Sequence, residues 1–220
     1  MKLKDTERLD DLQFNNLQII QDKTGYLFTS DAVALANYVK PCINAKVVEL
    51  CSGSGVISIL INAKNKVNSI KMVEIQECMA DMSKRSLEYN NITNIEVIND
   101  RLQGVHKAIG TGFDVVVCNP PYKARGTATK LNDNKVVAIA KHEVEVTLDE
   151  IVSEADKLLK FGGDFYIVNK EERLVDMLTI LREHKIEPKE LVVLPSKSGA
   201  NTIMIKAKKG GKGGIKITLK

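Results

Sequence analysis

Residues 46–63 read KVVELCSGSGVISILINA, and this stretch decides the fold. A short run rich in valine and leucine leads into a turn with glycines at positions 53 and 55, and an apolar run from about Val56 to Ala63 follows. This order predicts a buried strand, a tight turn and a helix, the first unit of an open parallel sheet with crossover helices. The third glycine of the dinucleotide motif is missing, which disfavours a pyrophosphate ligand.

The same alternation continues along the chain. Apolar runs rich in valine and isoleucine predict strands, and amphipathic stretches between them predict helices. We expect further strands at 69–74, 95–98, 113–118 and 165–168, an antiparallel hairpin of 191–194 with 202–207, and helices at 77–89, 147–159 and 171–184. Thr147 and Glu150 form a capping-box pattern, and Gly162 and Gly163 are expected to end that helix. The fold class is therefore α/β: a Rossmann-like seven-stranded, mostly parallel sheet with an antiparallel C-terminal hairpin and helices on both faces.

The charge is unevenly distributed over three expected parts of the chain. These are an N-terminal cap segment over residues 1–40, the main domain over 41–208, and a basic, glycine-rich tail over 209–220 that we expect to be a flexible arm. The net charge is +4, yet residues 195–220 carry seven lysines and no acidic residue, and residues 121–142 are also basic. Two basic segments on an acidic body favour a polyanionic partner, and the alternative is a solvated loop and a frayed tail.

Several classes of protein are disfavoured. The chain has no run of about 20 apolar residues and no apolar signal region near its start, so we expect a cytoplasmic protein without a membrane partner. The four cysteines lie far apart, and the three histidines lack metal-ligand spacing. We therefore expect reduced thiols and no metal.

Polar residues follow three of the expected parallel strands. Glu74 ends the second strand, about 20 residues after the glycines, where a carboxylate can accept hydrogen bonds from both hydroxyls of a ribose. A plain surface glutamate is the alternative. Asp100 follows the third strand and could accept from an adenine amino group, cap a helix, or do both.

The fourth strand ends in Asn119-Pro120-Pro121-Tyr122, the most specific signal in the chain. Two prolines fix the backbone and remove two donors, so the Pro120 carbonyl and the Asn119 side-chain oxygen can point outward as paired acceptors. Such a pair suits a planar NH2 group.

These residues resemble the Rossmann-like S-adenosylmethionine (AdoMet) methyltransferases, with VVELCSGSG, MVEIQ, VINDR and VVVCNPPY as successive motifs. The NPPY form is similar to the branch that methylates amino groups, and the whole chain resembles the tRNA adenine-N6 methyltransferases that modify the adenine beside the anticodon of a valine tRNA. Glu49 and Cys51 depart from the usual first motif, and Lys141 stands where arginine is usual. The resemblance implies that the following residues bind the cofactor: Glu49, Cys51, Gly53, Gly55, Glu74, Ile75, Asp100, Arg101 and Asn119.

The resemblance also implies an RNA partner, a tRNA. We expect the protein to be a monomer or a weak dimer. The catalytic turn would consist of Asn119, Pro120, Pro121 and Tyr122. Tyr122 would stack on the target base once that base is flipped out of the RNA. The basic residues expected to contact phosphates are Lys123, Arg125, Lys130, Lys208 and Lys209. His142 is taken as structural or RNA-facing. The expected helix after 28–31, with Ser30 or Asp31 as its N-cap, is either a lid over the cofactor or part of the core.

Three other functions stay open. Glutamine methyltransferases acting on a protein release factor share NPPY, but they resemble a longer chain with a preceding helical domain. DNA adenine methylation would need a target-reading domain for which 220 residues leave no room. A non-enzymatic RNA-binding module would need no intact cofactor motifs.

Overall fold

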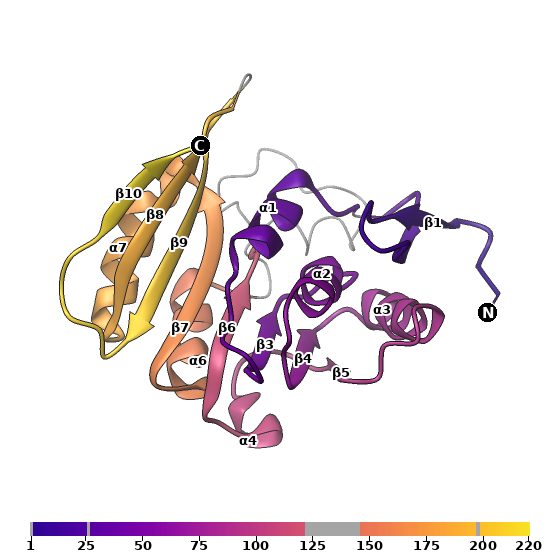
Figure 1. Cartoon of the computed structure of the whole chain (residues 1–220), viewed down its shortest axis with the longest axis horizontal. Coiled ribbons are helices and arrows are strands. Elements are labelled where there is room, and N and C mark those ends of the chain that lie inside the picture. Colours follow the sequence, from indigo (N-terminus) through magenta and orange to yellow (C-terminus); the bar gives the residue numbers. More distant parts are fainter. Residues whose placement is uncertain (1, 26, 122–145, 197–198) are drawn as a thin grey trace.

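The computed structural model describes residues 2–25, 27–121, 146–196 and 199–220. Its centre is an eight-stranded sheet in the order β10-β8-β9-β7-β6-β3-β4-β5, and a separate two-stranded sheet lies near the N-terminus (Figure 1). The strands of the large sheet are β3 (Lys46–Leu50), β4 (Ser69–Glu74), β5 (Ile95–Asn99), β6 (Phe113–Cys118), β7 (Leu159–Lys170), β8 (Ile186–Leu194), β9 (Thr202–Lys209) and β10 (Lys216–Leu219).

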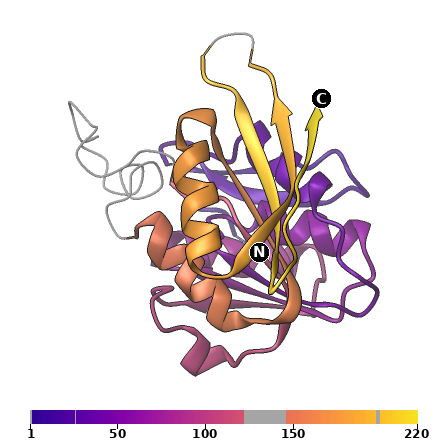
Figure 2. The same ribbon diagram turned by 90° about the vertical axis from the view of Figure 1, so that its left-hand side faces the viewer.

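Helices cover both faces of this sheet, as predicted. They are α1 (Ser30–Tyr38), α2 (Val56–Lys64), α3 (Glu77–Tyr89), α4 (His106–Ile109), α6 (Leu148–Leu158) and α7 (Leu174–Glu183), with a 3-10 turn, η1, at Glu171–Arg173. Side chains of α1, α2 and α3 pack on one face, and those of α6 and α7 pack on the other. Figure 2 shows α6 and α7, in orange, on the opposite side of the strands from the purple N-terminal helices. No helix among the described residues is long and apolar enough to cross a membrane.

The parallel half of the sheet matches the prediction closely. β3 lies between β4 and β6, and Leu50 is the register partner of both Val73 and Cys118. These strands are buried on both faces, which is why they read as continuous apolar runs. Their carboxyl ends therefore lie at one edge of the sheet, where the loops that follow them meet.

The region around β7 differs from the prediction at two glycines. The capping box of α6 is confirmed, because Thr147 and Glu150 bind each other's backbone N–H groups. Gly162 and Gly163 do not end that helix, however, because β7 already begins at Leu159 and contains both glycines. They lie where the register with β6 shifts, and a Cβ at Gly163 would lie 3.1 Å from the backbone oxygen of Phe113. Gly163 therefore allows a close approach of β7 to β6, and Gly162 has a left-handed φ of 78°.

The N-terminal hairpin of β1 (Glu7–Asp11) and β2 (Gln18–Asp22) was not predicted. It packs on α3, with Ile20 against Met79 and Met82. Arg85 of α3 donates to both carboxylate oxygens of Glu7, at 2.8 and 2.6 Å. Long-range contacts of this kind leave no periodic signal in ten residues of sequence.

The C-terminal tail is not the flexible arm that its composition suggested. Residues 216–219 form β10, which pairs in parallel with β8 and gives the sheet its eighth strand. The preceding turn is also anchored, because Lys189 Nζ donates to the carbonyl oxygens of Lys212 and Gly214 at 2.8 and 2.7 Å. The short alternating sequence KITL can pair because the edge of β8 offers unpaired backbone groups. The expected boundaries at residues 40 and 208 stay predictions.

Candidate functional site

A pocket opens at the carboxyl ends of β3, β4 and β6, where the strand order reverses. Ligands bind at this position in open α/β sheets. The pocket has a volume of about 910 Å³, including its opening to solvent. Its described lining residues are Phe28, Ala32, Glu49, Cys51, Ser52, Gly53, Ser54, Val56, Ile57, Val73, Glu74, Ile75, Gln76, Met79, Asp100, Leu102, Gln103, Asn119, Pro121 and Val146.

The loop after β3 forms the pocket floor in a left-handed conformation. Gly53 and Gly55 have φ of 55° and 87°, and Cys51 has φ of 56°. A Cβ at Gly55 would lie 3.0 Å from the Met72 side chain, so the position needs glycine both for its φ and for its space. Ser52 lines the same pocket, and its buried Oγ has no partner among the described residues. A ligand with a polar group here would satisfy that hydroxyl.

Glu74 connects two loops of the pocket. Its Oε2 accepts from the Gly53 N–H at 2.8 Å, and its Oε1 accepts from the Gln76 N–H at 2.9 Å. Burial raises the pKa of this carboxyl, and the two backbone N–H groups oppose that shift. Each oxygen keeps a lone pair, so the carboxylate can still accept two hydrogen bonds from a ligand.

Glu49 is fully buried beside the pocket and acts on the start of α2. Its Oε2 accepts from the Ser58 N–H at 3.0 Å and from the Ser58 hydroxyl. Removal from water raises the pKa of Glu49 to about 8, and the negative charge of Glu74 adds to the shift. Glu49 therefore holds a proton near neutral pH and attaches α2 to β3.

The end of β5 supports Glu74 through Asn99, and the next residue, Asp100, lines the pocket. Asn99 Nδ2 donates to the carbonyl oxygens of Glu74 and Ile75, at 2.8 and 3.2 Å. Asp100 lines the pocket, but it does not cap a helix, because α4 begins only at His106; its Oδ1 accepts from the Arg101 N–H. Arg101 is exposed and is not among the described lining residues.

The turn after β6 brings Asn119 and Pro121 into the pocket wall. Pro120 is buried between them. Because Cys118 pairs with Leu50, this turn lies directly beside the loop that carries Cys51 and Gly53. Tyr122, Lys123, Arg125, Lys130, Lys141 and His142 lie outside the described residues.

Lys208 and Lys209 are not near this pocket. β9 runs antiparallel to β7, so its last residues lie at the amino end of β7, at the opposite edge of the sheet. There Lys208 pairs with Asp164 at 2.6 Å and Lys209 pairs with Asp156 at 3.1 Å. The structure thus keeps these two lysines apart from the strand-end residues, and their proposed RNA contacts stay a prediction.

Phe28, just before α1, and Ala32, in its first turn, form one wall of the pocket, which we call the outer wall. The N-cap is Thr29, not Ser30 or Asp31, and its side chain makes no capping hydrogen bond. The lid expectation and the core expectation both hold in part, because Ala32 lines the pocket while Leu35 and Ala36 are buried in the core. Gln76, Met79, Gln103 and Val146 also line the pocket. Of these four, only Gln76 and Met79 could have been placed near the pocket from the sequence, because they lie in the turn and helix directly after Glu74.

Comparison with known proteins identifies the family. The model of the Methyltransferase small domain family matches residues 30–186, more than two thirds of the chain. The chain belongs to the Methyltransferase small domain family. It is therefore an AdoMet-dependent methyltransferase, and AdoMet is the cofactor that the family implies.

Relatives of this methyltransferase include proteins named "tRNA1(Val) (adenine(37)-N6)-methyltransferase". The one from Shewanella sp. (strain W3-18-1) is 23% identical over 197 residues, covering 87% of this chain and 81% of the relative. The one from Cytophaga hutchinsonii is 23% identical over 71% of this chain and 65% of the relative. Among solved structures, a predicted O-methyltransferase from Agrobacterium tumefaciens has a TM-score of 0.67 at 18% identity, covering 86% of this chain and 85% of that one. TYW2 of M. jannaschii, solved with AdoMet, has a TM-score of 0.63 at 12% identity, covering 94% and 88%. Both structures support the fold.

The residues of the methyltransferase pocket fit AdoMet. The glycine loop permits close approach, Ser52 offers an unpaired buried hydroxyl, and Glu74 offers acceptors for two ribose hydroxyls. Ile75 is 37% exposed on the same wall and offers an apolar surface. Among the described residues, no group of three or more histidine, cysteine, aspartate or glutamate side chains could hold a metal ion.

The raised pKa of Glu49 predicts a pH-dependent stability. Between about pH 4.5 and pH 8 the folded chain holds a proton on Glu49 that the unfolded chain has lost, so rising pH favours unfolding, by up to about 1.4 kcal/mol per pH unit. Glu49→Gln is neutral at every pH and lacks this contribution. Urea unfolding at several pH values should show the wild type losing stability relative to Glu49→Gln as pH rises. Parallel pH profiles would contradict the buried, protonated state.

Glu74→Ala should weaken AdoMet binding, because two hydrogen bonds to the ribose are lost. A loss of roughly 1.5 to 3 kcal/mol corresponds to about 10- to 150-fold in affinity. Titration calorimetry measures this directly. Glu74→Gln is the matched control, since its amide oxygen can still accept from the Gly53 N–H, and it should lose less. Unchanged affinity in a folded Glu74→Ala variant would remove Glu74 from the ribose role.

Proposed function

We propose that this methyltransferase transfers a methyl group from AdoMet to the exocyclic N6 amine of an adenine in RNA. The observation that carries the proposal is the position of Asn119 and Pro121 in the same pocket as the glycine loop and Glu74. In this proposal Asn119 and the Pro120 carbonyl act as an acceptor pair for the amine, beside the residues proposed to bind the cofactor. The names of the relatives support a narrower target, the adenine beside the anticodon of a valine tRNA.

Asn119 and Pro120 would act on the amine as acceptors. The lone pair of an aromatic amine is delocalised into the ring, which makes the nitrogen a poor nucleophile. Hydrogen bonds from its two N–H groups to the Asn119 side-chain oxygen and the Pro120 carbonyl would favour a pyramidal nitrogen and orient its lone pair. Positioning and electrostatics of this kind lower the barrier without covalent catalysis.

A strong base is not required in this reaction. AdoMet supplies an electrophilic methyl group on a positively charged sulfur. With AdoMet bound, the methyl group would pass to the amine nitrogen, and the proton that this nitrogen then loses could go to water. Cys118 directly precedes Asn119, but burial raises the pKa of its thiol, so it stays neutral and apolar. The described residues around Asn119 therefore serve to orient the amine and exclude water.

Asn119→Ala should reduce methyl transfer by roughly 100-fold or more while AdoMet affinity changes less, because the missing acceptor acts mainly on the reacting amine. Single-turnover rates and calorimetry separate these two effects. Asn94→Ala is the matched control, since Asn94 precedes β5 at the opposite edge of the sheet and pairs with Asn62. A near wild-type rate in Asn119→Ala would show that the turn after β6 has only a structural role.

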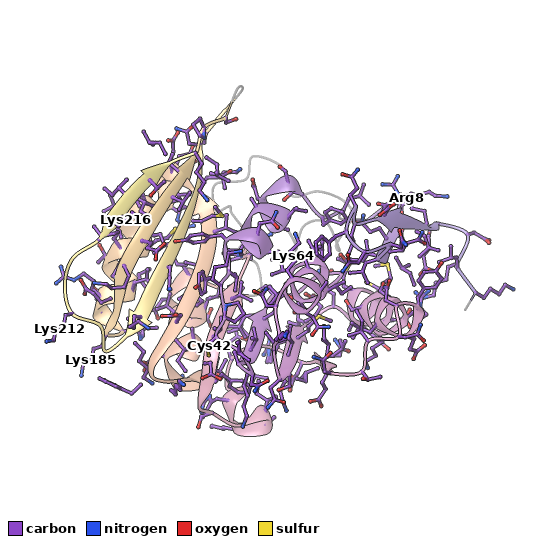
Figure 3. All side chains as sticks on the ribbon, viewed as in Figure 1. Arg8, Cys42, Lys64, Lys185, Lys212 and Lys216 are labelled. Carbon is purple, nitrogen blue, oxygen red and sulfur yellow. The ribbon has the colours of Figure 1, made fainter. Side chains whose placement is uncertain are left out.

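The tail lysines give a prediction about the RNA partner. Lys216 and Lys220 are exposed and have no ion pair among the described residues. Figure 3 shows Lys185 and Lys212 at one end of the β8–β10 region and Lys216 further along it. The double variant Lys216→Gln/Lys220→Gln should bind tRNA with a shallower salt dependence, by about 0.7 to 0.9 in slope for each phosphate that these lysines neutralise in the wild type. Lys71→Gln is the control, because Lys71 pairs with Glu96 between β4 and β5 and belongs to no proposed RNA contact. Equal slopes for the double variant and the wild type would show that Lys216 and Lys220 do not contact phosphates.

The deciding experiment is mass spectrometry of nucleosides. RNA that lacks the modification is incubated with the enzyme and labelled AdoMet, digested, and examined for N6-methyladenosine. Label in the nucleoside supports the proposal. Label that appears only in a glutamine of an added release factor would replace it with protein methylation, since an amide NH2 also fits the acceptor pair. Absence of AdoMet binding would favour a non-enzymatic module.

A further inference from the structure

Among the described residues, the pocket wall formed by Phe28 and Ala32 is not fixed by a helix cap of its own. Phe28 and Ala32 line the pocket, and α1, which begins between them at Ser30, has no side-chain cap at Thr29. A nine-residue helix without a cap gains little stability by itself. The position of this wall must therefore come from contacts with other parts of the chain.

One contact comes from the antiparallel side of the sheet. Lys170, the last residue of β7, is the register partner of Thr202, the first residue of β9. The Lys170 Nζ donates to Asp31 Oδ2 at 2.8 Å and to Thr202 Oγ1 at 2.7 Å, and Thr202 Oγ1 donates to Asp31 Oδ1 at 3.0 Å. Two paired strand ends thus hold both oxygens of one carboxylate in the first turn of α1.

The side chains of this contact are partly or fully shielded from solvent, which strengthens their hydrogen bonds. The side chains of Lys170 and Asp31 are 30% and 15% exposed, and Thr202 is buried. Hydrogen bonds to charged groups that are partly removed from water are stronger than those between exposed ion pairs. Lys170 and Asp31 are 139 residues apart in sequence, so the contact links distant parts of the fold.

The N-terminal hairpin holds the other end of the wall. The Phe28 N–H donates to Gln21 Oε1 at 2.8 Å, and Gln21 is only 2% exposed. Gln21 in turn donates to Asp10 of the neighbouring strand. The wall segment is therefore attached at Phe28 to the hairpin and at Asp31 to the end of β7.

We propose that Lys170 is a positioning residue for the cofactor pocket, acting with Thr202 through Asp31 to hold Phe28 and Ala32 against the bound AdoMet. Lys170 is not among the described pocket-lining residues and acts only through α1. Loss of its ammonium group removes one cation that binds Asp31, and the first turn of α1 is then held less firmly against the pocket. The inference concerns cofactor binding and rests on the family assignment rather than on the identity of the methyl acceptor.

The test compares AdoMet affinity in matched variants by calorimetry, at a temperature where circular dichroism shows every variant folded. Lys170→Met should lower AdoMet affinity about 10-fold, as expected for the loss of one hydrogen bond to a charged group. Lys170→Arg, which keeps the charge, should recover most of it. Lys71→Met is the control, because the Lys71 side chain is 29% exposed, close to the 30% of Lys170, and its ion pair with Glu96 joins β4 to β5 rather than to α1.

Three results would overturn the proposal. Unchanged affinity in folded Lys170→Met would show that the wall does not depend on Lys170, and an equal loss in Lys71→Met would show a general effect of instability. A failure of Lys170→Arg to recover affinity would show that the ammonium charge is not the cause. Because no RNA is present, the comparison stands even where the wild-type chain fails to methylate any RNA, so the two proposals fail separately.

Discussion

The hydrogen bond from the Gly53 N–H to the Glu74 carboxylate is the interaction on which the pocket depends. It joins the loop after β3 to the end of β4 across 21 residues. The carboxylate is costly to bury, and the backbone N–H groups of Gly53 and Gln76 offset part of that cost. Asn99 then fixes the backbone at Glu74 from the neighbouring strand. A left-handed turn, a buried acid and an asparagine thus form one connected unit that keeps ligand acceptors in place.

The two buried carboxyl groups beside the pocket, those of Glu49 and Glu74, bind different parts of the chain. Glu49 has its Oε2 bound to the start of α2, and burial keeps it protonated near neutral pH. Glu74 lies beside it but is bound by two backbone donors from separate residues, which favour the charged form. Burial raises the pKa of both carboxyl groups, and the two differ in what they attach: Glu49 binds Ser58 of α2, whereas Glu74 joins the two loops beside the pocket.

Sequence reasoning succeeded where the signal is local and failed where it depends on distant partners. The bounds of β3, β4 and β6 follow from apolar runs that are buried on both faces, and Thr147 with Glu150 marks the start of α6. Glu74 and Asn119 could be placed together because parallel strands end at one edge. β10 was missed because lysine and glycine around KITL conceal a strand whose partner, β8, lies elsewhere. Lys208 and Lys209 were grouped with the loop lysines as expected phosphate contacts, and only the antiparallel direction of β9 shows that they lie at the far edge. Pocket residues from irregular segments, such as Gln103 and Val146, have no pattern that could reveal them.

The direction of β10 has a practical consequence for engineering the molecule. Because β10 runs parallel to β8, the chain leaves the sheet at Lys220 on the edge where the pocket also opens. An affinity tag or fluorescent protein fused after Lys220 would extend from that edge and could obstruct a large substrate. The turn at Gly210 to Ile215 lies at the opposite edge, close to the start of β8, and is the better place to attach a probe or a surface linkage.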